Sequence, residues 1–347
     1  MSFVPFQRIP ATFTAIALCC VLTFSSVKVG PESEVAAKPT QSPHLVELSA
    51  QVHEQVAVKL AVAQKEAADR TAGQRAWHEL FTDLNQKVMT YLKSQVGTYG
   101  YILLVQQAAG SQGLNATIGF RQNEPFQMAS TFKLPVNLYL YRQIERKNFS
   151  LNQQLKYEAR FYESGTGILQ AEHPGGSYSI RHLAALSIRQ SDNVAVNILL
   201  SALGRANVIN YMHQLGASNS PTEPTPQATP ADLAIFLREV EKLAVSMPEL
   251  GNLLLDDLNH TAYNDRIPAG LPAGTPVAHK IGTLLGVVND AAIVSSTNAH
   301  YILVILSKQV NEAEASQVEA RVSHMIWQTL NVPIVPAPKK LRADLEG

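Results

Sequence analysis

The 347-residue chain has only two cysteines, Cys19 and Cys20, and both lie in one apolar stretch near the N-terminus. The rest of the chain therefore has no disulfide, no thiol nucleophile and no thiolate metal site. Charge imbalance is also missing, because 28 basic and 28 acidic residues leave a formal net charge of zero. Without a basic stripe, the sequence does not favour nucleic-acid binding. Its histidines form no metal-ligand spacing, so neither a metal nor another cofactor is expected.

Long hydrophobic runs are scarce as well. Residues 11–26 form an uncharged apolar run that is preceded by Arg8. A charged start followed by a short apolar core is typical of a secretory leader. The run is shorter than the roughly 20 residues that usually span a membrane. We therefore predict export, to the extracellular space or the outer face of the cytoplasmic membrane. Residues 1–30 then act as a signal peptide or as a membrane anchor through residues 11–26.

The next segment, residues 31–73, carries apolar residues at three- and four-residue steps, which indicates an amphipathic helix. It is predicted to be a helical stalk or linker; a self-associating or partner-binding helix is the alternative. A folded domain is expected over residues 74–332, with a C-terminal tail over 333–347.

Within that domain, the residue pattern predicts helices and strands in a definite order. A helix around Trp77–Leu92 precedes strands at 99–107 and at about 116–120, and residues 134–265 are mainly helical. Strands return at 277–281, 287–295 and 300–306 before a closing helix at 313–330. The predicted fold class is α/β (α+β), with an antiparallel sheet flanked by helices plus an all-helical lobe.

Three short motifs carry the chemistry: Ser130-Thr131-Phe132-Lys133, Ser191-Asp192-Asn193 and Lys280-Ile281-Gly282-Thr283. Residues i and i+3 share one helix face, so Lys133 can take the proton of Ser130 and make its hydroxyl nucleophilic. A serine at position 191 and a lysine at 280 would complete an acyl-transfer site. Each motif is weak alone, and their order and spacing together make the prediction specific.

With these motifs, the chain over about residues 77–330 resembles the class A β-lactamase-like serine hydrolases of the penicillin-recognising superfamily. The segments 165–170, 174–181 and 229–230 are similar to that family too. The resemblance implies that Ser130 forms an acyl-enzyme and that Lys133 is the base, its pKa lowered by burial and by Lys280. Ser191, beside Lys280, would carry the proton to the leaving nitrogen.

For substrate binding, the resemblance implies roles for Asn193, Gly282 and Thr283. Asn193 would bind the substrate's side-chain amide. Thr283 follows Gly282 and would contribute its backbone N–H, with that of Ser130, to an oxyanion hole. The hydroxyl of Thr283, with Lys280, would hold a substrate carboxylate. Asp192 is expected to orient its neighbours.

Several positions depart from the family pattern. Ile281 replaces the usual threonine or serine, which removes one hydroxyl contact worth about 1 kcal/mol. The segment 216–227 is too short for the usual loop, and Glu223 is its only carboxylate and the weak candidate for the deacylation base. Asn289-Asp290, near which class A lactamases often carry an arginine, is expected to form a turn. Glu163 is weighed as a residue of the groove rim against the favoured interpretation, a surface charge.

The substrate is therefore predicted to be a β-lactam or a related peptide-like molecule from peptidoglycan, with slow deacylation. A D-alanyl-D-alanine-type peptidase, a penicillin-binding sensor module and a cell-wall ester hydrolase stay open as alternatives.

Overall fold

The computed structural model describes residues 58–59, 61–62, 64–65, 75–106, 115–217 and 225–331. The predicted leader, most of the predicted stalk, the tail at 333–347 and Glu223 lie outside these residues. No helix in this part of the chain is long and apolar enough to cross a membrane. The boundaries of the four predicted regions stay predictions.

A five-stranded antiparallel sheet forms the centre of the fold, with strand order β2-β1-β9-β8-β7. Its strands are β1 (Thr98–Gln106), β2 (Ala116–Phe120), β7 (Val277–Leu284), β8 (Val287–Ser295) and β9 (His300–Lys308). Seven consecutive residues of β9, from Tyr301 to Ser307, are buried, which is typical of a strand covered on both faces. β7 lies at one edge of the sheet, and this edge carries the lysine-glycine motif.

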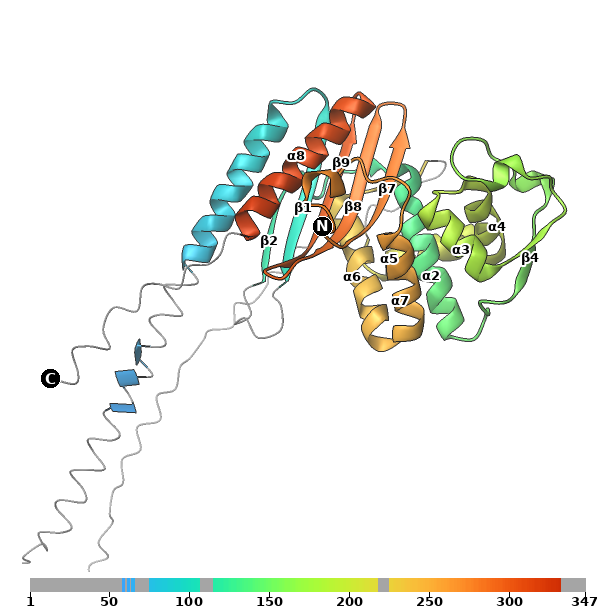
Figure 1. Cartoon of the computed structure of the whole chain (residues 1–347), viewed down its shortest axis with the longest axis horizontal. Helices are drawn as coiled ribbons and strands as arrows, with labels where there is room; N and C mark the ends of the chain where they lie inside the picture. The colour runs from blue at the N-terminus through green and yellow to red at the C-terminus, as the bar shows by residue number, and fades with distance from the viewer. Residues whose placement is uncertain are drawn as a thin grey trace, which may run out of the picture. The chain divides into compact units, whose positions relative to one another are not determined.

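Helices cover both faces of this sheet (Figure 1). The helix over 75–93 and α8 (Glu312–Leu330) pack on one face through a core that includes Leu84, Val88 and Ile326. The other face packs against α6 (Pro230–Ser246). Thr229 and Asp232 form a capping box at the start of α6, because each side chain accepts from the other residue's backbone N–H.

The remaining helices form the helical lobe, which lies beyond β7 (Figure 1). They are α2 (Lys133–Glu145), α3 (Ile180–Arg189), α4 (Asn193–Leu203), α5 (Arg205–Gln214) and α7 (Pro248–Asn259). Two-stranded pairs join β3 (Phe126–Gln127) to β6 (Gln227–Ala228) and β4 (Gln154–Lys156) to β5 (Ser177–Ser179). Short 3-10 turns lie at Ala129–Phe132, Ala159–Phe161, Leu169–Ala171 and Pro268–Gly270.

The predicted fold class is confirmed: the antiparallel sheet, its flanking helices and the helical lobe are all present. The predicted strands begin within one residue of the observed ones, and β7 runs three residues further than expected, to Leu284. Asn289-Asp290 is a correction. Both residues are buried and pair with β7, so they belong to β8, the strand predicted at 287–295, and no turn forms there.

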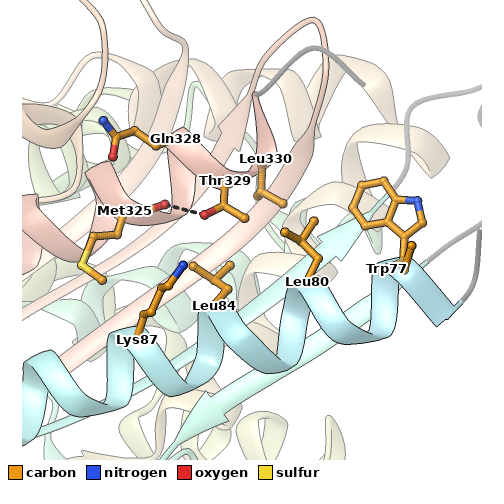
Figure 2. A pocket seen from close by; sticks show the side chains of 9 residues that line it. Trp77, Leu80, Leu84, Lys87, Met325, Gln328, Thr329 and Leu330 are labelled. Carbon is orange, nitrogen blue, oxygen red and sulfur yellow. Dashed lines mark hydrogen bonds between the residues drawn. The ribbon is translucent and has the colours of Figure 1, made fainter. Parts of the chain in front are cut away.

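Where the helix over 75–93 meets the end of α8, an apolar hollow of about 570 Å³ remains. Trp77, Leu80 and Leu84 line one wall, and Met325 and Leu330 line the other (Figure 2). None of the residues of the three sequence motifs lines this hollow.

Candidate active site

Ser130 lies on the 3-10 turn Ala129–Phe132, directly before α2, which begins at Lys133. The prediction placed the serine and the lysine on one α-helix. Because residues i and i+3 eclipse each other in 3-10 geometry, the turn places both side chains on the same side of the chain. Ala129 has a positive φ of 49°, a conformation that non-glycine residues rarely adopt. The side chain of Thr131 donates to Met128 O (2.7 Å) and closes the turn.

β7 passes so close to this turn that Gly282 is required there. A Cβ on Gly282 would lie 2.6 Å from Met128 O, 2.9 Å from Thr131 N and 3.0 Å from Ser130 N. All three atoms are backbone, so no side-chain rotation would relieve the contact. The absence of a side chain at Gly282 therefore lets the edge of β7 lie against the amide of Ser130.

The side chain of Ser191 lies between the two lysines. Its Oγ receives hydrogen bonds from Lys133 Nζ (3.2 Å) and Lys280 Nζ (3.0 Å). Lys133 also donates to the carbonyl of Ser191 and to Asn193 Oδ1 (2.7 Å), and Lys280 donates to Ile281 O (2.9 Å). Ser191 has a positive φ of 51°, which turns the chain just before α4. Residues 58 and 89 positions from Ser191 in the chain thus meet at one hydroxyl.

Burial lowers the pKa of both lysines. It lowers the pKa of Lys133 to about 8, against the opposing effect of the Asp192 and Glu163 carboxylates. Burial also lowers the pKa of Lys280 well below its usual value, and the neighbouring Lys133 adds to this. We expected both burial and Lys280 to lower the pKa of Lys133. Burial does so, but the effect between the two lysines is on the pKa of Lys280.

Asn193 and Asp192 hold the start of α4 to the glycine-rich loop at 165–170. Asp192 Oδ1 caps the helix by accepting from Ala195 N (2.8 Å), and its Oδ2 accepts from Ile168 N and Leu169 N (2.7 and 2.8 Å). A Cβ on Gly167 would lie 2.3 Å from the Asp192 carboxyl group, so only glycine fits there.

Asn193 does not point a free amide into the groove. Its Oδ1 accepts from Lys133, and its Nδ2 donates to Ser164 O (3.0 Å). In this structure the side chain therefore joins the lysine to the glycine-rich loop, where the sequence analysis expected a contact to substrate.

Arg266 is the residue of this region that the sequence analysis missed. Its buried guanidinium donates to Gly282 O (3.0 Å), Asn289 O (2.7 Å) and Thr283 Oγ1 (2.5 Å). The segment before β7 thus supplies a buried arginine that contacts the backbone of β8 at Asn289. Its 14-residue separation from Lys280 is the only signal in the sequence, and without the strand register it is not informative.

His279 faces away from Lys280, as neighbours on a strand do. It is buried, and its ring nitrogens contact Asp290 Oδ1 (3.0 Å) and Thr261 Oγ1 (2.8 Å). Among the residues described here, no group of three or more His, Cys, Asp and Glu side chains is placed to hold a metal ion. Glu223 lies outside those residues, so the structure does not place it.

A five-stranded antiparallel sheet with helices on both faces and a helical lobe beside its edge strand is a β-lactamase/transpeptidase-like fold. The structure of PBP-A superimposes with a TM-score of 0.66 at 26% identity, over 71% of this chain and 95% of that one. A mutant of PBP-A was solved as an acyl-enzyme complex with penicillin G.

Two curated relatives are similar in sequence. β-Lactamase SME-1 of Serratia marcescens is 24% identical over 63% of this chain and 81% of that protein. A β-lactamase of Mycobacterium tuberculosis is 29% identical over 56% of this chain and 69% of that protein. The model of the β-lactamase enzyme family matches residues 83–330. The chain therefore belongs to the β-lactamase enzyme family and is a β-lactamase-like serine hydrolase.

Proposed function

We propose that this protein forms an acyl-enzyme on Ser130 with a β-lactam or a related peptide-like amide, and that the adduct is hydrolysed slowly. The observation that carries the proposal is the hydroxyl of Ser191 between two buried lysines, at 3.2 Å from Lys133 and 3.0 Å from Lys280. In this arrangement protons can pass between the two lysines and the hydroxyl of Ser191, beside the proposed nucleophile Ser130.

In the proposed acylation, the hydroxyl of Ser130 attacks the amide carbonyl while neutral Lys133 accepts its proton. A base with a pKa of about 8 suits this step, since a substantial fraction is neutral near physiological pH. Ser191 then gives its proton to the departing nitrogen and is reprotonated from Lys133. Lys280 holds the hydroxyl of Ser191 in place during this transfer.

The oxyanion would be stabilised by the backbone N–H groups of Ser130 and Thr283, as the resemblance implies. The close approach of β7 at Gly282 supports this, because it brings the end of the strand against the Ser130 turn. Thr283 Oγ1 accepts from Arg266, which leaves its own proton free to donate to a substrate carboxylate. Arg266 thus helps Thr283 to make up for the hydroxyl that Ile281 lacks.

Slow deacylation is supported by the short segment 216–227, whose only carboxylate is Glu223. Without a general base, the step that needs one typically slows by roughly a hundredfold to ten-thousandfold.

A peptidase or penicillin-binding role is the second candidate, and the similarity to PBP-A favours it. We also propose export, on the leader pattern of residues 1–30.

The test follows the mass of the intact protein after penicillin G is added. Turnover of a transient adduct at Ser130 supports a lactamase, and a long-lived adduct supports the slow enzyme or the penicillin-binding role. If no adduct forms but a simple acyl ester is still cleaved, the result refutes the proposed function and supports the cell-wall ester hydrolase. Ser130→Ala is the matched control: a variant with full activity in the positive assay would refute the site.

A further inference from the structure

A carboxylate that the proposed mechanism does not use lies on the face of α4 that carries Asn193. Glu163 Oε2 accepts a hydrogen bond from Asn197 Nδ2 (2.8 Å), and Asn197 also donates to Phe161 O (3.3 Å). Asn197 is one helical turn beyond Asn193, and residues four apart are neighbours on a helix surface. Two asparagines of α4 therefore fix the segment that carries Glu163.

The same face of α4 also contacts Lys133, the proposed catalytic base. Asn193 holds Lys133 at 2.7 Å through its Oδ1 and Ser164, the neighbour of Glu163, through its Nδ2 (3.0 Å). The backbone on both sides of Glu163 is thus attached to α4, and one of the two attachments is the asparagine that also binds Lys133. The carboxylate cannot move away from this face without breaking the contact to Asn197.

When Ser130 is acylated, Lys133 gains a proton in a buried place next to a second lysine. The charged groups that act on its pKa are the carboxylates of Asp192 and Glu163, while the amine of Lys280 lies across Ser191 Oγ from it. Asp192 already accepts from three backbone N–H groups, which fix it as a structural cap. Glu163 is the other carboxylate of this set, and its partner is a neutral amide.

We propose that Glu163 is a positioning residue that acts through Lys133: its carboxylate, held by Asn197, stabilises the Lys133 ammonium formed during acylation. This inference rests on the proposed function. The proton moves from Ser130 Oγ to Lys133 Nζ as the new bond joins Oγ to the carbonyl carbon. The amide C–N bond then breaks, Ser191 gives its proton to the departing nitrogen, and Lys133 returns a proton to Ser191. The role of Glu163 is electrostatic compensation: its carboxylate is exposed, and solvent partly screens its attraction for the buried amine of Lys133.

The test measures the rate of Ser130 acylation by penicillin G, by quenched intact-mass analysis, from about pH 6 to pH 10. Neutral Lys133 is the reactive form, and a nearby carboxylate raises its pKa. Glu163→Gln should therefore shift the acid limb of the profile to lower pH, by on the order of 0.5 pH unit for a partly solvated charge. Glu163→Asp, which keeps the charge, should lie between the two profiles.

Glu158→Gln is the matched control, because Glu158 is an exposed glutamate of the same lobe that pairs with Arg160. Asn197→Ala is a second test variant, since it releases Glu163 and should shift the profile in the same direction. Profiles for Glu163→Gln and Asn197→Ala that superimpose on those of the wild type and Glu158→Gln would overturn the inference. A wild-type protein that never acylates would refute the proposed function instead, so the two failures are distinguishable.

Discussion

The contact between Gly282 and the Ser130 turn gives the most direct test of the site. Gly282→Ala adds one methyl group on the edge of β7, where it would lie 2.6 Å from Met128 O. Ordinary contact begins at 3.4 Å, so the strand and the turn must separate by several tenths of an ångström. Gly282 itself does not have a positive φ, so the effect of the substitution comes from this contact and not from backbone strain.

A displacement of this size separates the Ser130 amide and the end of β7, which together would form the oxyanion hole. Misplacement by about 1 Å typically reduces a rate on the order of a hundredfold. We expect the rate constant for acylation by penicillin G to fall by about that factor. Overpacking should also lower the free energy of unfolding by about 1–3 kcal/mol, measured by urea denaturation.

Gly176→Ala is the control, because the three atoms nearest to a Cβ there all belong to the side chain of Tyr178, with its hydroxyl at 3.0 Å. That side chain can rotate, so both the acylation rate and the stability should stay close to the wild type. A folded Gly282→Ala variant that acylates within about threefold of the wild type would refute the geometry, since the loss expected from misplacement would be absent.

Three further outcomes are expected. With the pKa of Lys133 at about 8, acylation should be about a hundredfold slower at pH 6 than on its alkaline plateau, and a flat profile would contradict the assignment of the base. Asp192→Ala removes the cap of Ala195 N and two amide contacts, so it should lower stability by about 2–4 kcal/mol; an unchanged urea midpoint would argue against this. Burial raises the pKa of Glu319 well above its usual value, and neither oxygen has a hydrogen-bond partner among the described residues. Folding therefore disfavours the ionised form of this group, so Glu319→Gln should raise Tm at pH 7, with a gain that shrinks toward pH 4; a gain independent of pH would disprove the explanation.

Much of the fold could be predicted from the sequence because its signals are local. Alternation and apolar runs gave the strands of the sheet, and three- and four-residue periods gave the helices, including α8. The turn expected at Asn289-Asp290 was wrong for a definite reason. Both residues favour turns by propensity, but pairing with β7 on one side and β9 on the other outweighs that preference.

The candidate site also combines features that the sequence predicts with features that depend on tertiary contacts. The residue types and their order predicted Ser130, Lys133, Ser191 and Lys280 as site residues, and the structure brings Ser191 to both lysines. Arg266 could not be found in this way, because its partners are backbone carbonyls of β7 and β8 that become neighbours only through strand register. Its role depends on contacts that no short motif encodes.

The sequence by itself determined the elements, their order and the chemical groups available, because these depend on neighbours along the chain. Only the tertiary structure decided that the hydroxyl of Ser191 lies between two lysines, that burial lowers the pKa of Lys133, and that Gly282 must lack a side chain. The physical reason is that desolvation and close backbone contact arise between segments that are distant in sequence, and packing alone sets them.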